Sequence, residues 1–242
     1  MALFDESSYS FSLTDGRLCQ AFTRRSHLSA FVGTSGSDEA DSIPLFVNDV
    51  WPGCKALANF IDINRVDFEK KSVIEFGAGC ALPSCVAAMV GASNVVVTDY
   101  PGAHVLETIE LVMSKNQLLP GNVSVLGHEW GSDVLALLAR NSDTKFDAVL
   151  IAEPFWRDTK QYHSRLLQSI AAVLTKEGQC YIAFCHRPCE GHTIEDDLHF
   201  FVMAQQDSFD VEKKEVITGT YHDVDEYSNY VDVQLYVLSR QT

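Results

Sequence analysis

The stretch VIEFGAGCALPS, from Val73 to Ser84, has residue types and spacing that could bind a nucleotide. An apolar run leads into Gly77 and Gly79, and glycines let a backbone turn tightly and approach a ligand closely. Glu75 would repel a pyrophosphate, and Leu82 stands where a dinucleotide-binding motif has glycine or alanine. The Gly-Lys-Ser/Thr of a phosphate-binding P-loop is also missing. The turn therefore suits a positively charged ligand without phosphate, such as S-adenosylmethionine.

A second acidic residue, Asp99, ends the run NVVVTD, downstream of Gly79. A carboxylate at the end of the second strand of such a fold can accept hydrogen bonds from both ribose hydroxyls. Asp99 could instead be an N-cap or turn residue, and Glu75 could have a structural hydrogen-bonding role. We expect the two acids and the two glycines to bind the cofactor, together with Tyr100 beside Asp99.

These residues need strands and helices to position them. Apolar runs predict strands, helical periodicity falls between them, and this alternation implies a parallel, doubly wound sheet. The segments FDVEKKEVITG and YVDVQLYVLSR follow without a helix between them, which indicates an antiparallel pair at the sheet edge. The expected fold is α/β, with seven strands, a mostly parallel sheet and an antiparallel C-terminal hairpin. The strands are predicted at 72–76, 94–99, 122–127, 146–153 and 179–185, and the helices at 83–91, 102–117, 131–140 and 160–175.

The N-terminal part has a different pattern. YSFSLTDGRLCQAF alternates around Asp15-Gly16, which is typical of a tight β-hairpin. The polar segment 32–42 predicts a mobile loop, and apolar residues at helical spacing after Pro52 predict a helix. We therefore divide the chain into a hairpin and loop at 1–45 and a main domain at 46–242.

Composition limits the partners and the compartment. The formal net charge of −15 argues against nucleic-acid binding and would attract a basic protein segment, although the acidity could serve solubility alone. The sequence contains neither a long apolar run nor the start of a secretory signal, so no membrane span is expected. Seven cysteines are scattered without metal-ligand spacing. Free thiols, no metal and a cytoplasmic location fit this pattern.

VIEFGAGCALPSCVAAMVGASNVVVTDYP closely resembles the seven-β-strand S-adenosylmethionine-dependent methyltransferases of family 16, the lysine methyltransferase and nicotinamide N-methyltransferase-like group. The resemblance implies a Rossmann-like methyltransferase domain that uses S-adenosylmethionine and releases S-adenosylhomocysteine. VWPGCKALANFI resembles the upstream helix of the family, which implies that Trp51 lies near the cofactor. LGHEWG resembles the element whose tryptophan, here Trp130, borders the adenine.

FDAVLIAEPFW resembles the family strand that ends at the methyl-transfer site, where Ala152 would line the cofactor. The family usually has aspartate after this strand, whereas this chain has Glu153, followed by Phe155 and Trp156. We expect Glu153 to recruit and orient the acceptor amine, and the two aromatic residues to line a lysine channel. Glu153 could instead be a helix N-cap or a salt-bridge partner, and Trp156 could serve packing alone.

The stretch FCHRPCEGHTIEDDLHFFVMAQQDSFDVEKK resembles the subgroup that methylates translation elongation factor 1A at its N-terminal amine and a nearby lysine. An attacking amine must be neutral. Deprotonation at pH 7 costs about 4.6 kcal/mol for lysine and about 1 kcal/mol for an α-amine. Lysine chemistry therefore needs more help from desolvation and from the sulfonium.

The leading interpretation is a monomeric methyltransferase of a protein amine, with elongation factor 1A as a candidate substrate. A small-molecule N-methyltransferase would instead have a closed, aromatic-lined pocket. A non-catalytic binding module would not bind S-adenosylmethionine. A nicotinamide-dependent dehydrogenase fits poorly because of Leu82.

Overall fold

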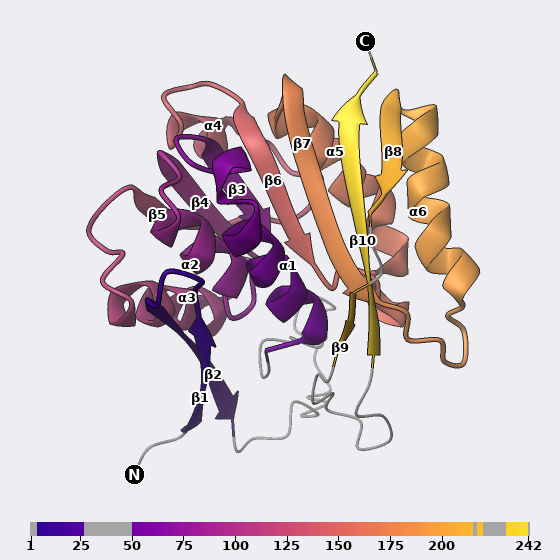
Figure 1. The fold of residues 1–242 in the computed structure, drawn as a ribbon. Coiled ribbons are helices and arrows are strands. Elements are labelled where there is room, and N and C mark those ends of the chain that lie inside the picture. The colour runs from indigo at the N-terminus through magenta and orange to yellow at the C-terminus, as the bar shows by residue number, and fades with distance from the viewer. Residues whose placement is uncertain (1–3, 27–49, 215–216, 220–230, 242) are drawn as a thin grey trace, which may run out of the picture.

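The computed structural model describes residues 4–26, 50–214, 217–219 and 231–241. A central sheet carries helices on both faces, and a separate two-stranded hairpin lies beside it (Figure 1). The loop expected at 32–42 lies outside the described residues. Within the described residues, no helix is both long and apolar enough to cross a bilayer.

The sheet has eight strands, with the order β5-β4-β3-β6-β7-β10-β8 and with β9 paired to β10. Strands β3 to β7 are mutually parallel, and β10 is antiparallel to β7, β8 and β9. The predicted doubly wound sheet with antiparallel C-terminal strands is therefore confirmed, and the short strand β9 is an addition. The bounds are β3 (Ser72–Phe76), β4 (Asn94–Asp99), β5 (Val123–Gly127), β6 (Phe146–Ala152), β7 (Leu174–Cys185), β8 (Phe209–Lys213), β9 (Ile217–Gly219) and β10 (Val231–Arg240).

Alternate residues of the strands point into two separate cores. In β6, Ala148 and Leu150 join the core beneath the helices α1 (Pro52–Ile63), α2 (Leu82–Met89) and α3 (Ala103–Lys115). Val149 and Ile151 join the core on the other face. The helices of that face are α4 (Leu135–Ala139), α5 (His163–Val173) and α6 (Ile194–Gln206). The described residues also include the 3-10 helices η2 (Arg65–Asp67), which follows α1, and η3 (Arg157–Tyr162), which precedes α5. This burial on both faces explains why the central strands read as continuous apolar runs.

The largest differences from the sequence expectations concern β7, α4 and α6. Strand β7 begins five residues earlier than predicted, at Leu174, and α4 covers only part of the predicted segment 131–140. Helix α6 has no counterpart among the predicted helices. Its start is set by a capping box, in which the side chain of Thr193 and the side chain of Asp196 bond each other's backbone N–H.

The N-terminal hairpin, β1 (Phe4–Ser12) and β2 (Leu18–Ser26), is held against the helices by side-chain hydrogen bonds. Buried Asp62 of α1 accepts hydrogen bonds from the backbone N–H of Thr14 at 2.6 Å and from its hydroxyl at 3.2 Å. Asn116, after α3, accepts from the N–H of Gln20 at 2.8 Å and donates to its carbonyl at 2.6 Å. The hairpin is thus fixed to α1 and α3 on one face of the sheet.

Candidate active site

The glycine-rich turn connects β3 to α2 with three residues in the left-handed region. Gly77 has φ 67°, Gly79 has φ 52° and Ala81 has φ 55°. The N–H of Ala78 donates to the carbonyl of Thr98 at 3.0 Å, which ties the turn to β4. A Cβ atom added to Gly79 would meet no heavy atom within 4 Å. The backbone of the turn is therefore open to close approach by a ligand.

Asp99, at the end of β4, is bound to this turn. Its Oδ2 accepts a hydrogen bond from the N–H of Gly79 at 2.7 Å, and its Oδ1 accepts one from the N–H of Tyr100 at 2.7 Å. Burial raises the pKa of Asp99, and these two hydrogen bonds oppose that effect. Each carboxylate oxygen can accept more than one hydrogen bond, so the fixed carboxylate retains capacity for ribose hydroxyls.

Glu75 is the penultimate residue of β3 and is fully buried. Its Oε2 accepts a hydrogen bond from the N–H of Ser84 at 3.1 Å, whereas its Oε1 has no hydrogen-bond partner within the described chain. Burial raises the pKa of Glu75 to about 8, although hydrogen bonding to Ser84 opposes the shift. A buried carboxylate with one unsatisfied oxygen fits a positively charged donor group nearby, as the ammonium or sulfonium of S-adenosylmethionine would provide.

Trp130 follows β5 and reaches the same turn. A Cβ atom on Gly77 would lie 3.5 Å from Cζ2 of Trp130, which is ordinary van der Waals contact. The indole is partly exposed. The structure therefore gathers Glu75, Gly77, Gly79, Asp99, Tyr100 and Trp130 around one turn at the carboxyl ends of β3, β4 and β5.

Glu153, directly after β6, is already bound by three hydrogen-bond donors. Its Oε1 accepts from the N–H of Gly53 at 2.7 Å, and its Oε2 accepts from the N–H of Cys185 at 3.2 Å and from Nη1 of Arg187 at 2.5 Å. Its side chain is 4% exposed. The carboxylate sits at the N-terminal end of α1, where the helix dipole favours negative charge. The geometry matches the salt-bridge alternative, and recruitment of an amine by Glu153 stays a prediction.

Trp51 and Trp156 lie beside the ion pair of Glu153 and Arg187. Their rings meet edge to face, with centroids 4.9 Å apart, and the guanidinium carbon of Arg187 lies 5.0 Å and 4.8 Å from the two ring centroids. The Nε1 of Trp156 donates to the carbonyl of Glu153 at 2.8 Å. Both indoles are partly exposed, so they form part of the surface near the end of β6.

Phe155 has a different position from the one expected. Its side chain is 1% exposed and lies among the rings of Phe184, Phe200, Phe201 and His163, with centroid distances from 4.6 to 5.8 Å. Strand β6 ends at Ala152, and Phe155 points into the core on the side of α5 and α6. This packing gives no support to a role in a substrate channel, and the expectation that Phe155 lines a lysine channel stays a prediction.

The first turn of α1 lies between the glycine-rich turn and the end of β6. Gly53 bonds Glu153, and the next residue, Cys54, forms a side-chain hydrogen bond with Cys80 in the glycine-rich turn. Ala152, 8% exposed, ends β6 next to this turn of helix. The cofactor-binding residues predicted at β3 and β4 thus adjoin the residues predicted for methyl transfer at β6.

Two residues of the site were not assigned from the sequence. Gly53 is required because a Cβ atom there would lie 2.7 Å from both Glu153 Oε1 and the carbonyl oxygen of Ala183. Arg187 lies within the stretch FCHRPCEG, which was noted only for its family resemblance. In the described part of the chain, no group of three or more His, Cys, Asp or Glu side chains could hold a metal ion.

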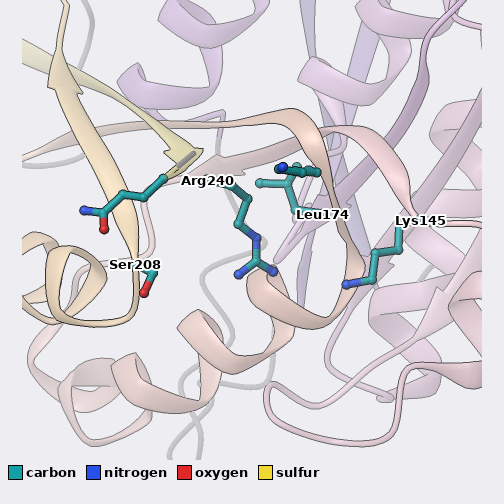
Figure 2. A pocket seen from close by; sticks show the side chains of 6 residues that line it. Lys145, Leu174, Ser208 and Arg240 are labelled. Atoms are coloured by element: carbon teal, nitrogen blue, oxygen red, sulfur yellow. The ribbon is translucent and has the colours of Figure 1, made fainter.

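A cavity of about 440 Å³ lies elsewhere and is unrelated to these residues (Figure 2). Lys145 precedes β6, Leu174 begins β7 and Arg240 ends the antiparallel strand β10, so the cavity is at the amino ends of the parallel strands. Ligands of open α/β sheets bind beyond the carboxyl ends. We therefore assign the candidate site to the glycine-rich turn and not to this cavity.

Comparisons with known proteins agree with this assignment. A family model described as lysine methyltransferase matches residues 40–207, a range that contains every predicted site residue. A protein N-terminal and lysine N-methyltransferase of Schizosaccharomyces pombe is 31% identical over 175 residues, covering 70% of this chain and 67% of the relative. The protein of the same name from Candida glabrata is 32% identical and covers 73% and 68%.

Solved structures show the same fold at lower sequence identity. A Pyrococcus horikoshii protein described as an RNA methyltransferase has a TM-score of 0.56 at 16% identity, over 78% of this chain and 81% of its own. A protein described as a methyltransferase and complexed with SAH has a TM-score of 0.58 at 14% identity, over 95% and 56%. At these identities the likeness establishes the fold.

Proposed function

The chain belongs to the lysine methyltransferase family, and from that membership we propose that it transfers a methyl group from S-adenosylmethionine to an amine of a protein, either a lysine side chain or an N-terminal α-amine. The observation that carries this proposal is the family match over residues 40–207, because that range includes both the glycine-rich turn and Glu153. The enzyme is thus an S-adenosylmethionine-dependent methyltransferase with a protein substrate.

The cofactor, when bound, supplies an electrophilic methyl group on a sulfonium. Asp99 is held by two backbone N–H groups in a position to accept the ribose hydroxyls, and the open backbone at Gly79 permits close approach. Trp130, beside Gly77, offers a flat apolar face to the adenine. Glu75 offers an unsatisfied, buried carboxylate oxygen to the positive end of the ligand.

The acceptor amine must reach the methyl group uncharged and in line, and positioning supplies much of the rate. Tyr100, Trp51 and Ala152 complete the surroundings of the turn and of the end of β6. Trp156 shields this region from water, which disfavours the ammonium form of the acceptor. Glu153 fixes the end of β6 to the start of α1 and to β7 through three hydrogen bonds.

For the acceptor, we propose translation elongation factor 1A, acting as a basic protein partner of a monomeric, cytoplasmic enzyme. The net charge of −15 supports a basic partner. The relatives named for both N-terminal and lysine methylation support the two kinds of amine. The resemblance of FCHRPCEGHTIEDD to the subgroup that modifies this factor supports its identity.

The test is to incubate the enzyme with labelled S-adenosylmethionine and purified elongation factor 1A, and to locate the label by mass spectrometry. We expect methyl groups on the N-terminal amine or on a nearby lysine. The Asp99→Asn variant should label far more slowly and serves as the matched control. Label in a pyridine or aryl amine, and none in protein, would overturn the protein-substrate proposal. Failure of the enzyme to bind S-adenosylmethionine by calorimetry would overturn the activity itself.

A further inference from the structure

A corner formed by two tryptophan rings, Trp51 and Trp156, holds the guanidinium of Arg187, and we call these two residues the tryptophan corner. The guanidinium carbon lies 5.0 Å and 4.8 Å from the ring centroids, and Nη1 donates to Oε2 of Glu153 at 2.5 Å. The side chains of Arg187 and Glu153 are 14% and 4% exposed. The arrangement is therefore a largely desolvated ion pair set against two aromatic faces.

A carboxylate beside aromatic faces is the usual chemistry for holding a cation such as an ammonium group. If an acceptor ammonium made these contacts, they would stabilise its charged form and raise its pKa. A protonated amine has no lone pair with which to attack a methyl group. In this structure a guanidinium from the chain itself makes the contacts, and an arginine side chain stays charged in proteins at all working pH values.

We propose that Arg187 is a specificity-determining residue of the acceptor site, because it fills the tryptophan corner and neutralises Glu153, so that the site takes the acceptor amine in its uncharged form. The inference rests on the proposed function, since that function brings the acceptor to the end of β6. Arg187 acts through the charge of Glu153 and does not touch the methyl group.

The neutral form that such a site takes is more abundant for α-amines than for lysines. An α-amine has a pKa near 7.8 and lysine one near 10.4, so at pH 7 the neutral fraction is about 300-fold larger for the α-amine. A site that gave strong support to the ammonium form would tie up either kind of amine in its unreactive state. With Glu153 neutralised, the rate of methylation at pH 7 reflects the neutral fraction of each kind of amine.

Other titratable groups lie on the elements packed around the ion pair. The thiol of Cys54 hydrogen-bonds that of Cys80, and this bond together with burial raises the pKa of Cys54 well above its usual value, so Cys54 is uncharged at neutral pH. His186 faces away toward α6, where Nδ1 lies 2.7 Å from Asp197 Oδ2. The groups nearby are Cys54 on α1, Glu75 on β3, Cys80 in the glycine-rich turn, Cys185 at the end of β7, His186 after it and Asp197 on α6.

The kinetic test compares wild type, Arg187→Gln and Arg187→Lys with a peptide acceptor over pH 6 to 10. In Arg187→Gln, the charge of Glu153 is no longer neutralised and should raise the pKa of the bound acceptor amine. The acidic limb of the plot of kcat against pH should therefore shift to higher pH by about one unit. At pH 7, kcat should fall about tenfold and KM should fall as well, and kcat should recover above pH 9. Arg187→Lys, which keeps the charge, should keep the wild-type limb. An equal loss of kcat at every pH would show a merely structural role and overturn the proposal.

A second measurement needs no catalysis. Tetramethylammonium, a permanent cation, is titrated while tryptophan fluorescence is recorded. We expect Arg187→Gln to bind it at least tenfold more tightly than wild type, because the tryptophan corner and Glu153 become available to an outside cation. Equal affinity for the two proteins would refute the inference. Should the wild type methylate no amine, the proposed function fails, and this titration still decides the role of Arg187.

Matched controls separate charge from folding. Arg157→Gln removes a guanidinium that is 59% exposed and pairs with Asp158, so it should change neither the pH limb nor the tetramethylammonium affinity. The double variant Glu153→Gln/Arg187→Gln removes both charges and should return the limb to within about 0.3 pH units of wild type. Thermal melting confirms that each variant is folded. A limb that stays displaced in a folded double variant would mean that Glu153 is not the group through which Arg187 acts.

Discussion

The carboxylate of Glu153 accepts a hydrogen bond from the backbone N–H of Gly53 at 2.7 Å, although 100 positions separate the two residues in the sequence. This contact places a negative charge at the start of α1, where the helix dipole stabilises it. It also brings the start of α1 to the end of β6, and the next residue of α1, Cys54, interacts with Cys80 of the glycine-rich turn. This bond between distant segments is one of the three that fix the position of Glu153.

Gly53→Ala should destabilise the protein by about 1–3 kcal/mol, because the new Cβ atom would meet Glu153 Oε1 and the Ala183 carbonyl oxygen, each at 2.7 Å. Urea unfolding measures the loss. Gly102→Ala is the matched control, since its Cβ atom would come no closer than 3.4 Å to a side-chain atom. Equal stability of the two variants would mean that the start of α1 can shift without cost.

Glu153→Gln should lower the methylation rate at least tenfold while leaving the affinity for S-adenosylmethionine within about threefold of wild type. Breaking a buried ion pair also costs about 3–5 kcal/mol, and the 14% exposure of the Arg187 side chain places the expected value at the low end. Rate assays and thermal melts measure the two effects. Methylation of every acceptor at the wild-type rate would remove Glu153 from the site.

Asp99→Asn should weaken binding of S-adenosylmethionine at least tenfold, or about 1.4 kcal/mol, because an amide presents one acceptor oxygen where the carboxylate presents two. Since Gly79 and Tyr100 both donate to Asp99, a small loss of stability should accompany it. Calorimetry gives the dissociation constant. Asp210→Asn on β8, an exposed position, should change nothing. Unchanged affinity in Asp99→Asn would place the ribose elsewhere.

Glu75→Gln should become more stable than wild type as pH rises from 5 to 8. The folded pKa of Glu75, about 8, lies above its unfolded value near 4.3, so folding retains a proton that the unfolded chain releases in this interval. Wild-type stability is therefore lost as pH rises, and the difference from the Gln variant should grow by up to about 4 kcal/mol. Urea unfolding at pH 5 and pH 8 measures it. A difference that is independent of pH would contradict the raised pKa.

Phe155→Leu should reduce stability by about 1–2 kcal/mol and leave the KM for a peptide acceptor within about threefold of wild type, because the ring packs in the core among four aromatic side chains. Leu135→Ala, at a side chain 68% exposed, should cost less than about 0.5 kcal/mol. A large rise in KM with unchanged stability would restore Phe155 to the substrate channel.

Much of the fold could be read from the sequence because burial on both faces leaves a strong pattern. The runs SVIEF and NVVVTD match β3 and β4 residue for residue. Helix α6 was not located, although its capping box and acidic first turn are helix-start signals, because its apolar residues do not fall on one face: Leu198 and Val202 are exposed and Phe200 is buried. The true start of β7 was missed because the polar residues at 175–177 resemble a turn.

Some residues of the site could be placed from the sequence and others could not. Glu75, Gly77, Gly79 and Asp99 could be placed together from sequence, since the carboxyl ends of neighbouring parallel strands meet at one edge. The approach of Arg187 to Glu153 could not, because it depends on how the chain leaves β7 and on the conformation of a long side chain. Phe155 and Trp156 are adjacent in sequence, yet a left-handed residue at Glu153, with φ 54°, and the turn after it separate their environments.

The position of β10 has a consequence for the order of assembly. Strand β8 precedes β10 in the chain but lies outside it in the sheet, so β10 must insert between β7 and β8. During synthesis on the ribosome, β7 and β8 are therefore made before the strand that joins them, and both present unpaired backbone until it arrives. Such edges invite pairing with other chains. Among the described strands, docking of β10 pairs the free side of β7 and one side of β8, and it leaves the outer side of β8 as the edge of the sheet.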